Sequence, residues 1–514
     1  MLVQTKGSAL IGIDAITITI EVNVSMGQGY CIVGLPDSSV KESLDRTESA
    51  IKANGFHMPR TKLVINLLPA EFKKTGAAFD LPIAIGILAA SEQVTPIHLL
   101  DQYIMMGELG LDGKLYPIKG VLAMAMQAKA EGYLGMLLPV GNESEACLVE
   151  HLDIFCFTHL TEVVHFFRDP NSKSPVKRNN YPVQNKQSSP SNFSDVKGQQ
   201  HVKRALEIAS VGSHNLIMIG PPGAGKTMLA KSLVSILPPL NQMEALETSK
   251  IYSITGKLDA VNKLLTHRPF RHPHHSLSAI ALIGGGSYPQ PGEISLAHNG
   301  VLFLDELPEF NRSVIEVLRQ PMEEGVVSIA RAKMSVSFPA RFMLIAAMNP
   351  CPCGYYNHPH KECHCSPPLI QKYMHKISGP LLDRIDLHIE VTPVLYHELR
   401  ASKDEETSES IAERVVKARN IQSNRFKDDK GTYTNAQMNK IQLKKYCTLS
   451  NEAEALLKSA MEKFQLSARA FDRIIKVSRS IADLEEENNI QISHISEALQ
   501  YRTLDKANWG QFKN

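Results

Sequence analysis

The chain has 514 residues, of which 43% are hydrophobic and 21% charged, and its formal net charge is +2. This length suits about three domains, and the composition fits soluble globular domains. The small net charge excludes a uniformly basic protein, so a nucleic-acid-binding surface would have to be a local patch. No apolar run approaches the roughly 18 residues that span a bilayer, and the first residues do not resemble a signal peptide. We therefore expect a cytoplasmic protein without a membrane partner.

Residues 1–168 show a mixed α/β pattern and are expected to form the first domain. Apolar and polar residues alternate over 15–24, as in a half-buried strand. A helical pattern follows at about 39–54, then an apolar strand at 63–67 and a second helical stretch at 81–90.

The composition then changes twice. Residues 169–194 are polar and rich in Pro and Ser, which predicts a linker that cannot bury enough apolar surface to order itself. Residues 195–393 contain the nucleotide-binding motifs described next. Residues 394–514 begin with a charged segment and then read as helices with few strand signals, which predicts a small helical domain.

The most informative motif is a P-loop of the form G-x-x-x-x-G-K-[ST]. It follows the apolar run 216–219 and precedes a helical pattern, the context that makes the motif credible. Glycines let backbone N–H groups surround phosphates, the lysine reaches the β- and γ-phosphates, and the threonine holds Mg²⁺. The sequence thus predicts an ATP site with Mg²⁺, formed by Gly220, Pro221, Pro222, Gly223, Ala224, Gly225, Lys226 and Thr227.

Two further apolar runs end in polar residues. Residues 301–304 read as a buried parallel strand, followed by Asp305, a candidate Mg²⁺ ligand, and Glu306, a candidate general base. Alone, this pattern more often marks a strand and a surface turn, but downstream of a P-loop the functional interpretation is favoured. Residues 343–348 end at Asn349, whose amide can bond the γ-phosphate or the attacking water; the alternative is an ordinary turn before proline.

These motifs, in this order, resemble the AAA+ ATPases, and more closely the ComM/YifB-type magnesium-chelatase-like proteins. The resemblance covers almost the whole chain, and its specific marks are the segments 195–199, 268–275, 299–306 and 378–386. It implies that Asn349 is sensor 1, Arg384 an arginine finger acting in trans and Arg469 sensor 2. From the residues alone, Arg384 would be an ordinary ion-paired arginine. Either Arg469 or Arg473 could supply the phosphate contact from the helical domain. A finger acting in trans implies a ring, expected to be a hexamer.

The resemblance also implies a fold. We expect an α/β P-loop AAA+ core with a helical C-terminal lid, preceded at residues 1–168 by an α+β Lon-protease-like domain (the ribosomal protein S5 domain 2-like fold). The segment 106–120 carries the resemblance to that fold. In that fold a Ser–Lys dyad cleaves peptides. The serine would fall near 76–80 and the lysine near Met124, and neither residue type occurs there. Peptidase activity is therefore not expected, and the domain is interpreted as a scaffold.

Two segments between the motifs are candidates for DNA contact. Three glycines, Gly284 to Gly286, predict an exposed loop tip, which in similar proteins projects toward a central pore. Alternation over 326–338 predicts a hairpin before the Asn349 strand. Arg331 and Lys333 at its tip could follow a phosphate backbone, although two basic residues on a turn are often simply solvated.

Four of the eight cysteines crowd into fifteen residues of sequence. Two C-x-C pairs can converge tetrahedrally on zinc, which predicts a structural zinc site made by Cys351, Cys353, Cys363 and Cys365. The alternative is a loop with four reduced thiols, which would be reactive if exposed. Such a zinc would brace the loop attached to Asn349 rather than take part in catalysis.

Three functions compete. The resemblance implies a ring-forming, ATP-dependent DNA motor that acts on single-stranded or branched DNA, as a branch-migration helicase in homologous recombination and natural transformation. The alternative is a magnesium-chelatase-like remodeller of a protein partner. An ATP-dependent peptidase is disfavoured by the missing dyad.

Overall fold

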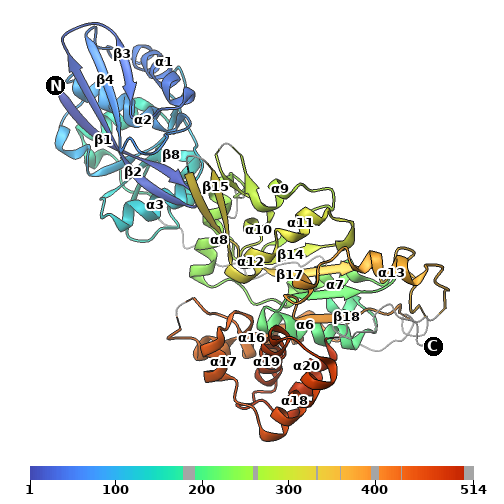
Figure 1. Cartoon of the computed structure of the whole chain (residues 1–514). Helices are drawn as coiled ribbons and strands as arrows, with labels where there is room; N and C mark the ends of the chain where they lie inside the picture. The colour runs from blue at the N-terminus through green and yellow to red at the C-terminus, as the bar shows by residue number, and fades with distance from the viewer. Residues whose placement is uncertain are drawn as a thin grey trace. The chain divides into compact units, whose positions relative to one another are not determined.

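The computed structural model describes residues 1–177, 192–258, 264–286, 288–331, 334–358, 360–394, 405–429 and 431–502 (Figure 1). The chain forms two compact units. The first comprises Met1–Pro182 and Gln242–Leu265, and the second comprises Val183–Asn241 and Thr266–Asn514. Residues 178–191 of the expected linker lie outside the described residues.

The first unit is built on a mixed seven-stranded sheet in the order β3-β4-β2-β1-β5-β8-β9. Its strands are β1 (Leu2–Ile11), β2 (Asp14–Ser25), β3 (Tyr30–Val33), β4 (Lys62–Leu68), β5 (Tyr103–Met105), β8 (Gly135–Pro139) and β9 (Asp153–Phe157). The β1–β2 and β2–β4 pairs are antiparallel, whereas β3–β4, β1–β5, β5–β8 and β8–β9 are parallel. The short pair β6 (Glu108–Leu109) and β7 (Leu115–Tyr116) is antiparallel. The strands expected at 15–24 and 63–67 are confirmed as β2 and β4.

Helices of the first unit are α1 (Ser38–Ala53), α2 (Asp80–Ala90), α3 (Val121–Ala130), α4 (Glu143–Ala146) and α5 (Leu160–Arg168). The helical stretches expected at 39–54 and 81–90 are confirmed as α1 and α2. Every residue of α2 is buried. A helix that is apolar on all sides belongs inside a core, and α2 packs against β1 and β2. Met124, near the position where a Lon-type lysine is expected, is a buried residue of α3.

Helix α8 (Gln242–Thr255) belongs to the first unit, although its chain neighbours on both sides belong to the second. Leu246 packs against the apolar core of the first unit. Lys250 Nζ lies 2.6 Å from the carboxylate of Asp14, and the Ser253 hydroxyl donates to the carboxylate of Glu145. The sequence showed surplus length between Lys226 and Asp305, but not that part of it would pack in another unit.

The second unit is built on a five-stranded sheet in the order β11-β14-β17-β10-β18. All neighbouring strands are parallel. The strands are β10 (Leu216–Ile219), β11 (Phe270–Arg271), β14 (Val301–Leu304), β17 (Met343–Met348) and β18 (Leu387–Glu390). Every residue of β10, β14 and β17 is buried. Such continuous apolar runs are typical of parallel strands covered on both faces, and these three strands confirm the sequence predictions.

Around this sheet lie α6 (Gln200–Gly212), α7 (Lys226–Leu233), α9 (Ala279–Ile283), α10 (Glu293–Leu296), α11 (Arg312–Glu316), α12 (Arg319–Glu324), α13 (Pro367–Met374) and α14 (Gly379–Leu382). Two hairpins interrupt this series. They are β12–β13 (Gly284–Gly285 and Gln290–Pro291) and β15–β16 (Val326–Arg331 and Met334–Pro339). The second is the hairpin that the alternation over 326–338 predicted.

The C-terminal part is helical, as predicted, with α16 (Ser408–Arg425), α17 (Lys440–Tyr446), α18 (Asn451–Phe464), α19 (Ala468–Leu484) and α20 (Ile492–Gln500). One apolar cluster includes both sheet residues such as Ile345 and helical residues such as Ile474 and Ile495. The helical part therefore shares its core with the sheet, and Figure 1 shows α16 and α19 beside α6.

A buried carboxylate fixes this junction. Asp386, directly before β18, accepts a hydrogen bond of 2.9 Å from the backbone N–H of Asn215 and pairs at 2.8 Å with Arg473 of α19. His214 lies 3.4 Å from the same carboxylate. Burial would raise the pKa of Asp386, but the Arg473 guanidinium and the His214 ring outweigh it and hold this pKa well below its ordinary value.

We expect Asp386→Ala to lower the free energy of unfolding by about 3 kcal/mol, because it leaves the largely buried Arg473 without its counter-ion. Since the pKa of Asp386 is lowered on folding, its contribution is present above the ordinary value of 3.8 and lost as the pH falls below that value. Urea titrations at pH 7 and near pH 3 measure both effects. Asp383→Ala, on the same segment but not fully buried, is the control; equal losses in the two variants would contradict the prediction.

Candidate nucleotide-binding site

The P-loop lies where β10 ends and α7 begins. Gly223 and Gly225 have φ of +78° and +84°, a conformation that side chains rarely adopt. A Cβ added at either glycine would meet nothing within 4 Å, so both positions face open space. The first turn of α7 begins directly after these glycines, and the free backbone N–H groups at a helix N-terminus are suited to phosphate.

Lys226 is buried at the start of α7 and is surrounded by oxygen atoms. Its ammonium donates to the carbonyls of Gly220 at 2.7 Å and Pro221 at 3.0 Å, and to Asn349 Oδ1 at 3.1 Å. Burial lowers the pKa of Lys226, and the carboxylates of Asp305 and Glu306 oppose this shift. Phosphate oxygens of ATP would replace neutral acceptors with charged ones, which form stronger hydrogen bonds with an ammonium.

The side chains of Thr227 and Asp305 meet beside the P-loop. The Thr227 hydroxyl donates to Asp305 Oδ2 at 2.6 Å. A hydroxyl and a carboxylate at this distance fit the protein ligands of a nucleotide-bound Mg²⁺. These two residues are the ones that would hold a Mg²⁺ ion bound with ATP.

Glu306 occupies a strained backbone conformation beside them. Its φ is +53°, which costs a non-glycine residue about 1–3 kcal/mol. Hydrogen bonds hold it there, one from its own N–H to Asp305 Oδ1 at 3.0 Å and one from Glu309 N–H to its carbonyl at 2.8 Å. The carboxylate is largely exposed and lies 3.7 Å from His275 Nδ1. An exposed carboxylate next to the metal ligands suits the role of general base.

The segment 268–275 had no physical explanation from the sequence, and the structure supplies one. Arg268 donates to the carbonyls of Pro238 at 2.8 Å and Asn299 at 2.7 Å, and so ties the chain before α8 to the start of β14. Arg271 forms two hydrogen bonds of 2.6 and 2.7 Å with Glu293. The His272 ring packs 4.8 Å from the ring of Phe303. The segment thus positions the strand that carries Asp305 and Glu306.

The side chains of Arg384 and Arg469 are not among the groups that contact Lys226. Both contact Glu323 of α12 instead. Arg384 Nη2 lies 2.6 Å from Glu323 Oε1, and Arg469 Nη2 lies 3.8 Å from the same oxygen. Arg473, the competitor of Arg469, pairs with Asp386 instead. The roles of Arg384 and Arg469 toward a nucleotide stay predictions, and Glu323 is a residue that sequence reasoning missed.

The four cysteines converge. The Sγ atoms of Cys351, Cys353, Cys363 and Cys365 all lie within 4.8 Å of one another. Three of the separations are 3.3, 3.7 and 3.6 Å. Tetrahedral Zn–S bonds of about 2.3 Å would place the sulfurs about 3.8 Å apart, so the geometry suits a tetrahedral metal. Burial opposes ionisation of Cys353, but hydrogen bonds from Tyr355 and the neighbouring thiols lower its pKa to about 6.

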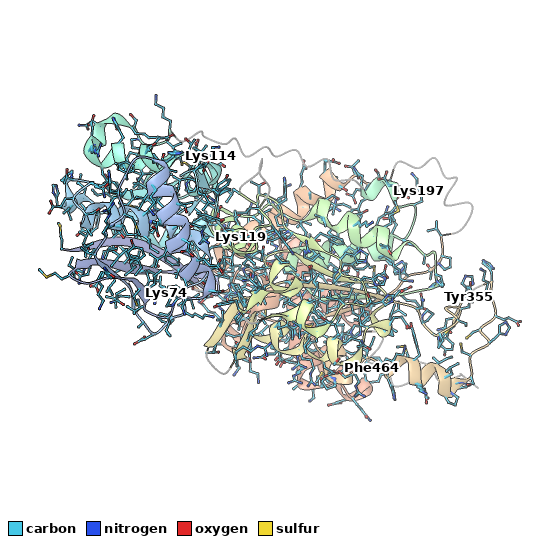
Figure 2. The ribbon with its side chains drawn as sticks, turned by 90° about the horizontal axis from the view of Figure 1, so that it is seen from above. Lys74, Lys114, Lys119, Lys197, Tyr355 and Phe464 are labelled. Carbon is cyan, nitrogen blue, oxygen red and sulfur yellow. The ribbon has the colours of Figure 1, made fainter. Side chains whose placement is uncertain are left out.

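The loop with these cysteines packs on the P-loop. A Cβ added to Gly354 would lie 2.5 Å from Pro222 Cδ, so only glycine allows the two backbones to approach this closely. Figure 2 shows the loop, marked by Tyr355, projecting from the ribbon. Any ion that fixes the loop therefore also supports one wall of the phosphate site.

The two hairpins lie against each other. A Cβ placed on Gly285 of β12 would lie 3.6 Å from Arg331 Nη2, and one on Gly284 would lie 3.2 Å from Ile329 of β15. Arg331 is exposed at the end of β15. The predicted partner Lys333 lies outside the described residues. Contact with DNA stays a prediction for both.

Comparison with known proteins decides the family. Residues 192–399 match the family described as magnesium chelatase, subunit ChlI; residues 20–142 match subunit ChlI of Mg-chelatase; and residues 405–502 match the ChlI C-terminal family. Competence protein ComM of Haemophilus influenzae is 44% identical over 506 residues, which cover 96% of each chain. The chain belongs to the ComM/YifB-type magnesium-chelatase-like family.

Two further proteins align with the chain to different extents. YifB of Escherichia coli is 41% identical over 500 residues, covering 97% of this chain and 96% of that protein. The chloroplastic magnesium-chelatase subunit ChlI of rice is 26% identical over 237 residues, covering 42% of this chain and 52% of that protein. No helix within the described residues is sufficiently long and apolar to span a membrane.

We expect Lys226→Ala to abolish ATP binding, because a P-loop lysine supplies the ammonium that binds the β- and γ-phosphates. Glu306→Gln should retain binding but slow hydrolysis about 10²–10⁴-fold, the usual contribution of a general base. A fluorescent ATP analogue and steady-state phosphate release measure the two steps. Lys231→Ala, on the exposed face of α7, should match the unmodified protein. A Glu306→Gln variant with full turnover would remove Glu306 from the chemistry.

Proposed function

We propose that the protein is a ring-forming, ATP-dependent DNA motor that drives branch migration of paired strands. The observation that carries the proposal is the juxtaposition of the exposed Arg331 with the glycine hairpin β12–β13. These two hairpins precede and follow β14, the strand before Asp305, in the chain. A phosphate backbone bound there would lie on the same unit that holds ATP. The name of the Haemophilus influenzae relative, competence protein ComM, supports a role in handling incoming DNA.

The ring is the second element of the proposal. Arg384 would act on the ATP of a neighbouring subunit, where an arginine is worth about 10³–10⁵ in rate. A finger that acts in trans requires a closed set of subunits, and a hexamer is the proposed form. Arg469 would serve as sensor 2 from α19. Single-stranded or branched DNA is the proposed partner.

For the first unit we propose the Lon-protease-like fold in a form without catalytic groups. Its mixed sheet and the buried α2 would provide the scaffold. The lysine of the dyad is expected near Met124, where the sequence has no lysine. The unit would serve as a collar of the motor rather than as a peptidase.

Magnesium-chelatase-like remodelling of a protein partner is the second candidate. All three family matches carry the chelatase description, and this observation favours it. ATP turnover that ignores DNA but responds to a porphyrin-binding partner would make this candidate the better one.

We expect single-stranded DNA to stimulate ATP hydrolysis, and Arg331→Glu to weaken DNA binding. Removing one cation that neutralises a phosphate should also reduce the salt dependence of binding, by about 0.7 in the slope of log K against log salt for single strands. Fluorescence anisotropy at several salt concentrations measures this, and strand displacement on a forked substrate tests the motor. Lys458→Glu on α18, the same change of charge at an exposed site, is the matched control. Equal DNA binding by the two variants would show that Arg331 is not part of the DNA site.

We further propose that Cys351, Cys353, Cys363 and Cys365 hold one structural Zn²⁺. Because their loop packs on Pro222, Cys363→Ser should remove the zinc and raise the KM for ATP several-fold, with a smaller effect on kcat. Mass-spectrometric metal analysis should find about one zinc per chain. Cys31→Ser, an exposed thiol outside the cluster, should change neither quantity. Purified protein that lacks zinc would contradict the proposal.

A further inference from the structure

Glu323 forms the contact that holds Arg384 in place. The Arg384 side chain is only 6% exposed, whereas that of Glu323 is 43% exposed. Arg384 Nη1 also donates to the carbonyl of Pro380, and its Nε has no hydrogen-bond partner among the described residues. An arginine buried in this way, with one donor unsatisfied, depends on a single carboxylate for charge neutralisation.

A cavity of about 440 Å³ opens beside this ion pair. Its charged lining consists of the carboxylates Glu316, Glu323 and Glu324 and the guanidinium groups of Arg319 and Arg384. Three acidic groups against two basic ones give the cavity a formal charge of −1. While its Nη2 lies 2.6 Å from Glu323, the Arg384 guanidinium is already neutralised, so it has to leave Glu323 before it can stabilise the phosphates of another subunit.

Glu323 also lies next to the hairpin proposed to touch DNA. It precedes Gly325, whose carbonyl accepts a 2.8 Å hydrogen bond from Ala340 and so closes the base of β15–β16. The hairpin is paired without interruption from Val326–Pro339 to Arg331–Met334. Val327 and Ser328 of β15 line the same cavity as Arg384. A displacement at the Arg331 end would therefore move the wall against which Arg384 rests.

We propose that Glu323 is a positioning residue that holds Arg384 in a resting pose and releases it when DNA displaces the β15–β16 hairpin. This inference rests on the proposed function, since it uses Arg384 as the trans finger and DNA as the partner. The hairpin would sense DNA, and α12, the helix that leads into it, would restrain the arginine. Arg469, 3.8 Å from Glu323, would keep the carboxylate neutralised after Arg384 departs.

The test is steady-state ATP hydrolysis by the full chain, with and without a single-stranded oligonucleotide. Glu323→Gln keeps the shape of the side chain but removes its charge, so the DNA-free rate should rise about tenfold. Stimulation by DNA should shrink accordingly, and the KM for ATP should be unchanged because Glu323 does not contact the P-loop lysine. Glu323→Asp, which retains the charge, should restore most of the low DNA-free rate.

Two further variants separate the possible outcomes. Glu324→Gln, the neighbouring carboxylate of the same cavity, bonded to Gln320 at 2.8 Å, should behave as the unmodified protein. Arg384→Ala should be slow with or without Glu323→Gln. If Arg384→Ala is slow but Glu323→Gln leaves the DNA-free rate unchanged or lowers it, the restraint is refuted while the finger stands. If Arg384→Ala hydrolyses ATP normally, the finger itself is refuted, and the restraint with it.

Discussion

The parallel sheet of the second unit imposes the constraint on which the site depends. The carboxyl ends of parallel strands meet at one edge of a sheet, so the residues that follow β10, β14 and β17 are brought together whatever their separation in sequence. These residues are the P-loop, Asp305 and Asn349, and their side chains meet as Thr227 with Asp305 and Lys226 with Asn349. The cysteine loop follows Asn349 directly and reaches Pro222 for the same reason.

Motifs and strands that are formed by neighbouring residues could be predicted from the sequence. The P-loop, the carboxylate pair Asp305–Glu306 and the cysteine quartet are contiguous or nearly so, and apolar runs predicted the strands before them. Contacts that depend on tertiary placement were not predictable. Glu323 is an ordinary helical glutamate in sequence, and nothing around it marks the approach of Arg384 from a distant segment of the chain. Arg268 was recognised only as part of a motif. Its acceptors are backbone carbonyls, which every residue has, so the sequence does not mark them as its partners.

Two arginines of helix α19 contact carboxylates of other segments, the exposed Glu323 and the buried Asp386. Arg469 and Arg473, one helical turn apart, lie on the same face of the helix. The first approaches Glu323 and the second pairs with Asp386. One face of α19 thus contacts both the segment before β18 and α12, the helix before the hairpin that is proposed to bind DNA. The helical part is consequently bound to the sheet by charge as well as by the shared apolar core.

The placement of α8 has a consequence for how the chain can be divided. The peptide backbone passes between the two units three times, near residues 182, 241 and 265. A single break in the segment between residues 177 and 192 would leave the units joined by two covalent connections. Removing the first 182 residues would strip α8 of the core against which Leu246 packs. Neither unit is therefore contiguous in the sequence, so no single segment of the chain corresponds to one of them.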